Sequence, residues 1–141
     1  EAAEVEAAGC RLMTYNPSAS QRRPGDIFTY ALIRSMVANG EAEAVTVGLS
    51  AIRQSIQGSI PAGNSGEGTR VYDSPVLKAW LPAIASSQLF LRLDLAAIFD
   101  TIDWDEEREI ARSWSRQRGG SVSGHMVERM KATLRASRSA A

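Results

Sequence analysis

Apolar residues recur at spacings of three and four along two neighbouring segments, which is the pattern of amphipathic helices. The first segment spans 26–39, with Asp26 as its expected N-cap and Asn39-Gly40 as its end. The second spans 41–57. Their apolar stripes consist of Phe28, Leu32, Ile33, Met36 and Val37, and of Val45, Leu49, Ile52 and Ile56. The short connection between the segments predicts an antiparallel helix pair.

The pattern of residues 74–102 predicts two more helices. The segment 74–85 begins with Ser74-Pro75, where serine is the expected N-cap and proline the first helical residue, and Pro82 is expected to shorten or kink the helix. Leucine at every second position of 89–95 would also suit a strand. A helix accounts for more residues, up to Ile102, and no second convincing strand exists to pair with this segment, so we predict a helix.

Two helices are predicted at the C-terminal end. Residues 103–118 form the first, with Asp103 at its start and further acidic residues in the first turn, where the helix dipole favours them. Gly119-Gly120 ends this helix, and Ser121 or Ser123 caps the last one. The apolar seam of the last helix consists of Val127, Met130 and Leu134.

These segments predict an all-α fold, a compact bundle of about six short helices with a glycine-rich loop near 58–70. Residues 1–24 are predicted to form an N-terminal arm or linker. Residues 25–141 are predicted to form a single helical domain that ends in a basic helix pair, 103–138. The expected core consists of Phe28, Leu32, Val45, Leu49, Ile52, Trp80, Leu95, Ile98 and Trp114.

Length and composition narrow the class of protein. A chain of 141 residues suits one domain, and 44% hydrophobic with 23% charged residues is typical of a globular protein. No apolar run approaches the roughly 20 residues of a membrane span, and the acidic start lacks the order of a signal peptide. Cys10 is the single cysteine, so no intrachain disulfide can form. We therefore expect a cytoplasmic protein without membrane contact.

The charges are segregated along the chain although the formal net charge is zero. Residues 1–60 carry 5 basic and 6 acidic groups, residues 61–107 carry 3 and 8, and residues 108–141 carry 8 and 2. A basic end of this kind indicates a polyanionic or acidic partner.

Motifs for catalysis and cofactor binding are missing from the sequence. The acidic residues of 100–109 lack the calcium-loop pattern, and the glycines of 63–68 match neither a dinucleotide-binding nor a P-loop motif. One cysteine and one histidine, Cys10 and His125, are too few for a zinc cluster, and no GxSxG elbow is present. We therefore predict no catalytic residues, metal or cofactor.

The candidate site is the basic end. Arg108, Arg112 and Arg116 recur every four residues and form one column on a helix, and Arg118 joins this column to the last helix. The last helix carries a second basic face, formed by Lys131, Arg135 and Arg138. All seven are candidate phosphate contacts, and His125 and Arg129, near the start of the last helix, are candidate base contacts.

The run 122–129, VSGHMVER, resembles the second helix of helix-turn-helix domains in its capping serine, its valine and its arginine two residues later. It departs from that pattern because Ile110-Ala111 lies several residues too far upstream.

The predicted function is that of a small helical, nucleic-acid-associated accessory subunit within a larger bacterial or phage nucleoprotein assembly. Its basic C-terminal helices would contact the phosphate backbone of DNA or RNA, and other protein subunits would be partners. The alternative is a protein–protein assembly subunit without nucleic-acid contact. No enzymatic activity is expected.

Overall fold

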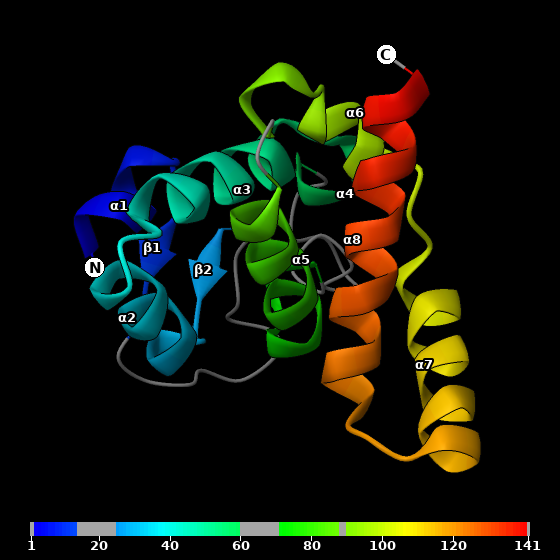
Figure 1. Ribbon diagram of the computed structural model, residues 1–141. Helices are drawn as coiled ribbons and strands as arrows, with labels where there is room; N and C mark the ends of the chain where they lie inside the picture. The colour runs from blue at the N-terminus through cyan, green and yellow to red at the C-terminus, as the bar shows by residue number, and fades with distance from the viewer. Residues whose placement is uncertain (1, 14–24, 60–70, 88–89, 141) are drawn as a thin grey trace.

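The computed structural model describes residues 2–13, 25–59, 71–87 and 90–140 (Figure 1). Of these residues 77% are helical and 4% are in strands, which confirms the all-α prediction. There are eight α-helices in this part of the chain: α1 Ala2–Ala7, α2 Tyr30–Ala38, α3 Ala42–Gln54, α4 Ile56–Ser59, α5 Ser74–Ser86, α6 Leu95–Asp100, α7 Trp104–Arg118 and α8 Val122–Ala140. A 3-10 helix, Phe90–Arg92, precedes α6. Two short strands, β1 Arg11–Leu12 and β2 Asp26–Ile27, pair in parallel.

Asp26 is not the N-cap of a helix, contrary to the sequence prediction. It lies in β2, buried, and its carboxylate pairs with Arg11 of β1 at 3.3 Å. Helix α2 begins four residues later, after Thr29. The ion pair and the strand pairing with a segment 15 residues away therefore outweigh the local capping preference.

The N-cap of α5 is Asp73, so the predicted cap, Ser74, is the first helical residue and Pro75 the second. The Ser74 hydroxyl shares a hydrogen bond of 3.0 Å with Thr29, a tertiary contact that replaces its capping role. The helix continues through Pro82 to Ser86.

The helix predicted over 89–102 is interrupted. Asp94 caps α6 by accepting a hydrogen bond from the Ala97 amide at 3.2 Å, and this cap separates α6 from the preceding 3-10 turn. The helix predicted over 41–57 is also divided, because Ser55 is extended. The Asp100 carboxylate then accepts hydrogen bonds from the amides of Ile56 and Gln57 at the start of α4.

The core is built around α5, which packs between α3 and α8 (Figure 1). The Trp80 indole of α5 donates a hydrogen bond of 3.0 Å to the Gly48 carbonyl of α3, where a Cβ would lie 2.6 Å from Leu81. Five of the nine predicted core residues are buried: Val45, Leu49, Ile52, Trp80 and Leu95. The other four are only half-buried: Phe28, Leu32, Ile98 and Trp114. Ile56, predicted on the α3 stripe, is exposed because it follows the break at Ser55.

Residues 2–13, placed by the sequence in an N-terminal arm, contribute to this core. Val5 of α1 is fully buried, and the Thr46 hydroxyl of α3 donates to the Glu4 carbonyl at 3.2 Å. The linker part of the predicted arm, 14–24, lies outside the described residues, as does 60–70 of the predicted glycine-rich loop. The independence of 25–141 as a domain stays a prediction.

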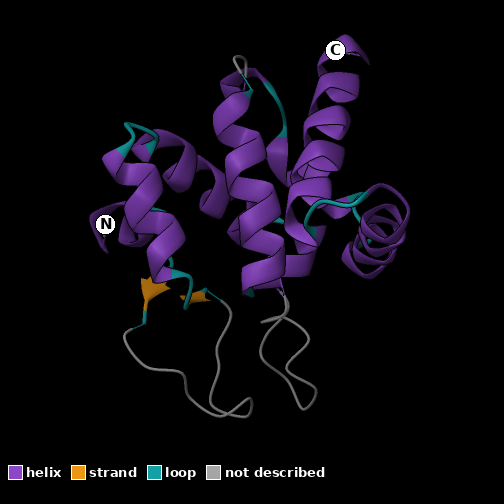
Figure 2. Cartoon of the chain, turned by 60° about the horizontal axis from the view of Figure 1, so that its bottom comes forward, coloured by secondary structure: helices purple, strands orange, loops and turns teal. Residues whose placement is uncertain are grey.

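Helices α7 and α8 are joined by the short turn Gly119-Gly120-Ser121, as the sequence predicted. Both glycines have positive φ values, +77° and +82°, which favour residues without a side chain. Asp103 caps α7 by accepting from the Glu106 amide, and Ser121 caps α8 by accepting from the Gly124 amide. In Figure 2, α7 is seen nearly end-on at the right while α8 is seen from the side, so the two helices cross steeply.

No helix in the described part of the chain is long and apolar enough to cross a membrane.

Candidate functional site

The helix pair α7–α8 separates acidic from basic residues. Residues 103–109 at the start of α7 contain five carboxylates and a single arginine, Arg108. Residues 110–127, which comprise the second half of α7, the turn and the start of α8, contain three arginines and no carboxylate. We call residues 110–127 the tip, because the turn projects beyond the body of the molecule (Figure 1).

The tip is ordered around Trp114, which is half-buried. The Arg118 guanidinium lies 4.8 Å from the centre of the indole ring and that of Arg129 lies 5.2 Å from it, both within cation–π range. The His125 ring meets the indole edge-on, with the ring centres 5.9 Å apart. These contacts join the last turn of α7 to α8.

Two hydrogen bonds hold the turn itself. The Nε2–H of His125 donates to the Gly119 carbonyl at 2.7 Å, and the Ser115 hydroxyl donates to the Gly120 carbonyl at 2.7 Å. The nitrogen must be the donor in the first of these bonds, since a carbonyl oxygen can only accept. The carbonyls at the end of α7 are thereby satisfied by side chains of the tip.

Three of the predicted contact residues are paired with carboxylates. Arg129 forms a two-pronged ion pair with Glu107, and this hydrogen bonding raises the pKa of the Arg129 guanidinium. Arg112 and Lys131 each pair with a glutamate three residues earlier on the same helix, at 2.6 and 3.3 Å. Arg112 and Lys131 are also half-buried.

Three other predicted residues, Arg116, Arg118 and Arg135, are exposed. Within the described residues they form no ion pair. Arg116 and Arg118 lie at the tip, but Arg135 is fourteen residues beyond Ser121 on α8, about 21 Å along the helix axis. The side chain of Arg138 lies outside the described part of the structure. The three arginines Arg112, Arg116 and Arg118 thus lie along the second half of α7, with Arg116 and Arg118 on opposite faces of that helix, and they are separate from Lys131 and Arg135.

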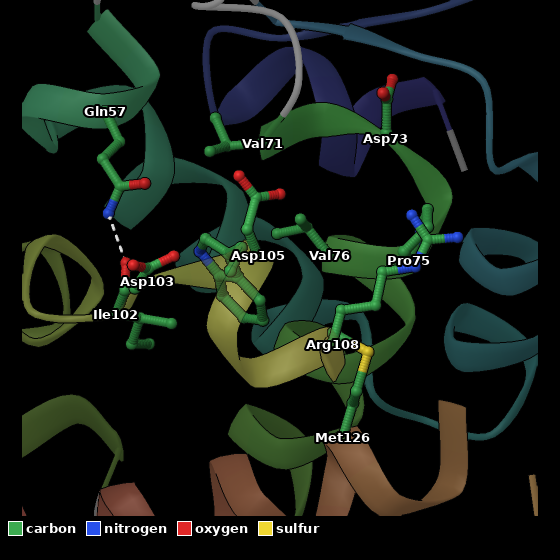
Figure 3. Close-up of a pocket in the computed structure, with 11 residues that line it drawn as sticks. Gln57, Val71, Asp73, Pro75, Val76, Ile102, Asp103, Asp105, Arg108 and Met126 are labelled. Carbon is green, nitrogen blue, oxygen red and sulfur yellow. Dashed lines mark hydrogen bonds between the residues drawn. The ribbon is translucent and has the colours of Figure 1, made fainter. Parts of the chain in front are cut away.

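Arg108 belongs to a different feature, a cavity of about 500 Å³ between α5, α7 and α8 (Figure 3). Its walls combine Asp73, Asp103 and Asp105 with the apolar side chains of Val71, Val76, Ile102 and Met126. Gln57 spans one wall, and its amide donates to the Ile102 carbonyl at 2.9 Å. No group of three or more potential metal ligands is present in the described part of the chain. The sequence carries no local signal for this cavity, because its walls come from segments far apart in the chain.

The resemblance of 122–129 to a helix-turn-helix motif has a limited counterpart in the fold. Two helices cross steeply after a short glycine-containing turn, as in that motif. Arg129, the expected base contact, is tied to Glu107, however. Comparisons of the chain with protein-family models, with curated proteins and with solved structures give no match.

Proposed function

We propose that the protein is a nucleic-acid-associated accessory subunit, and that its contact with the phosphate backbone is centred on the tip. The observation that supports this proposal is the charge distribution of the helix pair. Arg116 and Arg118 are exposed and free of ion pairs within the described residues, and no carboxylate occurs in 110–127. Arg129 and Lys131, by contrast, are already paired with glutamates.

The geometry of the tip also suits phosphate. Arginine presents a planar set of donors that matches the oxygens of a phosphate group. The stacking of Arg118 on Trp114 limits its motion, so less entropy is lost on binding. The N-terminus of α8 opens at the same place, and its partial positive charge adds to the attraction.

The second candidate function is protein assembly without nucleic-acid contact. It is favoured by the acidic start of α7, residues 103–109. The same acidic surface on a second copy of the chain would attract the basic tip. The partner would be another protein subunit or a second copy of this chain.

A salt titration distinguishes the two functions. Binding of a fluorescent nucleic acid should weaken steeply with salt, with a slope that reports the number of phosphates contacted. The double variant Arg116→Gln/Arg118→Gln should lower this slope by about two, since each lost phosphate contact accounts for about one. The matched control is Lys78→Gln/Arg92→Gln, which removes the same charge from two exposed residues of α5 and the 3-10 helix. It should leave the slope unchanged.

The proposal is wrong if the parent protein does not bind at low salt, or if the tip variant and the control bind alike. Protein assembly would then replace it. Circular dichroism of both variants provides the check that the fold is retained.

A further inference from the structure

The aromatic rings of the helix pair are already engaged in contacts within the protein. Besides the imidazole of His125, residues 103–141 contain two aromatic side chains, Trp104 and Trp114. Trp104 is buried against Phe99, with ring centres 5.5 Å apart. The ring of Trp114 already contacts the guanidinium groups of Arg118 and Arg129 and the edge of His125.

The two candidate base contacts are engaged as well. His125 uses Nε2 to hold the Gly119 carbonyl, and Arg129 uses Nε and a terminal nitrogen to hold Glu107. Base edges are read by side chains with free donors and acceptors, commonly by a bidentate arginine. With these groups engaged, the exposed charged groups that remain without an ion pair at the tip are the guanidinium groups of Arg116 and Arg118, which are two positions apart on α7 and so do not face each other.

These observations bear on the form of nucleic acid. Proteins that bind single strands stack successive bases on aromatic side chains, each worth about 1–3 kcal/mol. A surface of arginines without a free ring lacks these aromatic platforms and depends mainly on charge. A duplex presents one charge per roughly 1.7 Å of axis, about twice the density of one of its strands.

We infer that the tip binds double-stranded nucleic acid in preference to single strands and does so without regard to sequence. This inference rests on the proposed function, and it specifies the ligand as the paired phosphate backbones that duplex DNA and duplex RNA share.

The test compares four fluorescent ligands at low salt: a DNA duplex, an RNA duplex of the same sequence, one DNA strand alone, and a DNA duplex of scrambled sequence. We expect at least one of the unscrambled duplexes to bind about tenfold more tightly than the single strand, because its charge density is higher. The scrambled duplex should bind within about twofold of the original, because phosphate contacts carry no sequence information.

Three results would overturn the inference in distinguishable ways. Equal or tighter binding of the single strand contradicts the preference for duplexes while leaving the proposed function intact. A strong difference between the original and scrambled duplexes contradicts sequence-independent binding. Absence of binding to all four ligands contradicts the proposed function itself.

A variant of Trp114 tests whether bases of a single strand stack on its ring. In Trp114→Leu the affinities for the single strand and for the duplex should fall by the same factor, because the variant removes the support of Arg118 from both complexes and no base stacks on the ring. The affinity of the same variant for the duplex is the control for damage to the tip. A loss confined to the single strand would show that bases stack on Trp114 and would overturn the inference.

Discussion

The burial of single residues determines the chemistry that they can perform, and Cys10 is the clearest case. Its side chain is 6% exposed, and burial raises the pKa of its thiol to about 11. The thiol is therefore protonated at neutral pH, whereas a cysteine nucleophile must be a thiolate. The positive charge of Arg53 opposes this rise in the pKa of the thiol, and the negative charge of Asp26 adds to it.

The pKa of Cys10 predicts a loss of stability at alkaline pH. Between about pH 9 and pH 11 the thiol of the unfolded chain has lost its proton while that of the folded chain retains it, so the free energy of unfolding falls as pH rises. Urea denaturation at several pH values should show a steeper fall for the parent than for Cys10→Ala. Parallel curves for the two proteins would contradict the prediction.

At the scale of elements, a predicted N-cap residue caps its helix where its side chain has no hydrogen-bond or ion-pair partner from a distant part of the chain. Asp103 and Ser121 cap α7 and α8 by accepting from amides three residues ahead, as the sequence indicated. Asp26 and Ser74 were predicted as caps on equally good local grounds, but they bind Arg11 and Thr29 instead. A capping residue keeps its local role only if the fold offers it no other partner.

The turn between α7 and α8 allows a matched pair of substitutions. Gly119→Ala places a side chain at φ +77° and ψ −170°, a region that glycine alone adopts readily, so it should cost about 1–3 kcal/mol of unfolding free energy although no atom lies within 4 Å of the new Cβ. Gly120→Ala also falls at a positive φ, +82°, and brings its Cβ to 3.2 Å from Nε2 of His125.

Both substitutions should lower the free energy of unfolding, as measured by urea denaturation, but only Gly120→Ala disturbs a side chain of the tip. It should also weaken nucleic-acid binding more than Gly119→Ala, because it disturbs the hydrogen bond from His125 that holds the turn. Equal effects of the two substitutions on binding would mean that the contact with His125 is unimportant.

At the scale of the molecule, the N-terminal segment and the helical body share one core. Val5, Ala8 and Cys10 are buried with residues of α3 and α5, and β1 pairs with β2.

Removal of residues 1–13 should consequently lower the free energy of unfolding. The loss should be at least about 2 kcal/mol, since burial of one valine side chain alone contributes about 1.5–3 kcal/mol. Thermal and urea denaturation of the full chain and of a chain beginning at residue 14 would measure the difference. Equal stability of the two would support 25–141 as an independent domain and would show that α1 contributes little.

The sequence by itself was sufficient to predict the fold class and the approximate positions of the longer helices. The helices at 42–54, 74–86 and 104–118 follow from apolar periodicity and from boundary residues, which act within one or two turns of the chain. The column of arginines on α7 and the turn at Gly119-Gly120 are local features of the same kind, so they too could be predicted.

Only the tertiary structure decided which of these side chains are available for binding. The pairing of Glu107 with Arg129 joins residues 22 positions apart, and the cavity beside Arg108 draws its walls from α4, α5, α7 and α8. Such contacts depend on how helices pack, which periodicity does not specify because it identifies the buried face of a helix and not its neighbour. The sequence thus indicated a basic end, and the packing of α7 on α8 tied Arg129 to Glu107 while it left Arg116 and Arg118 exposed at the tip.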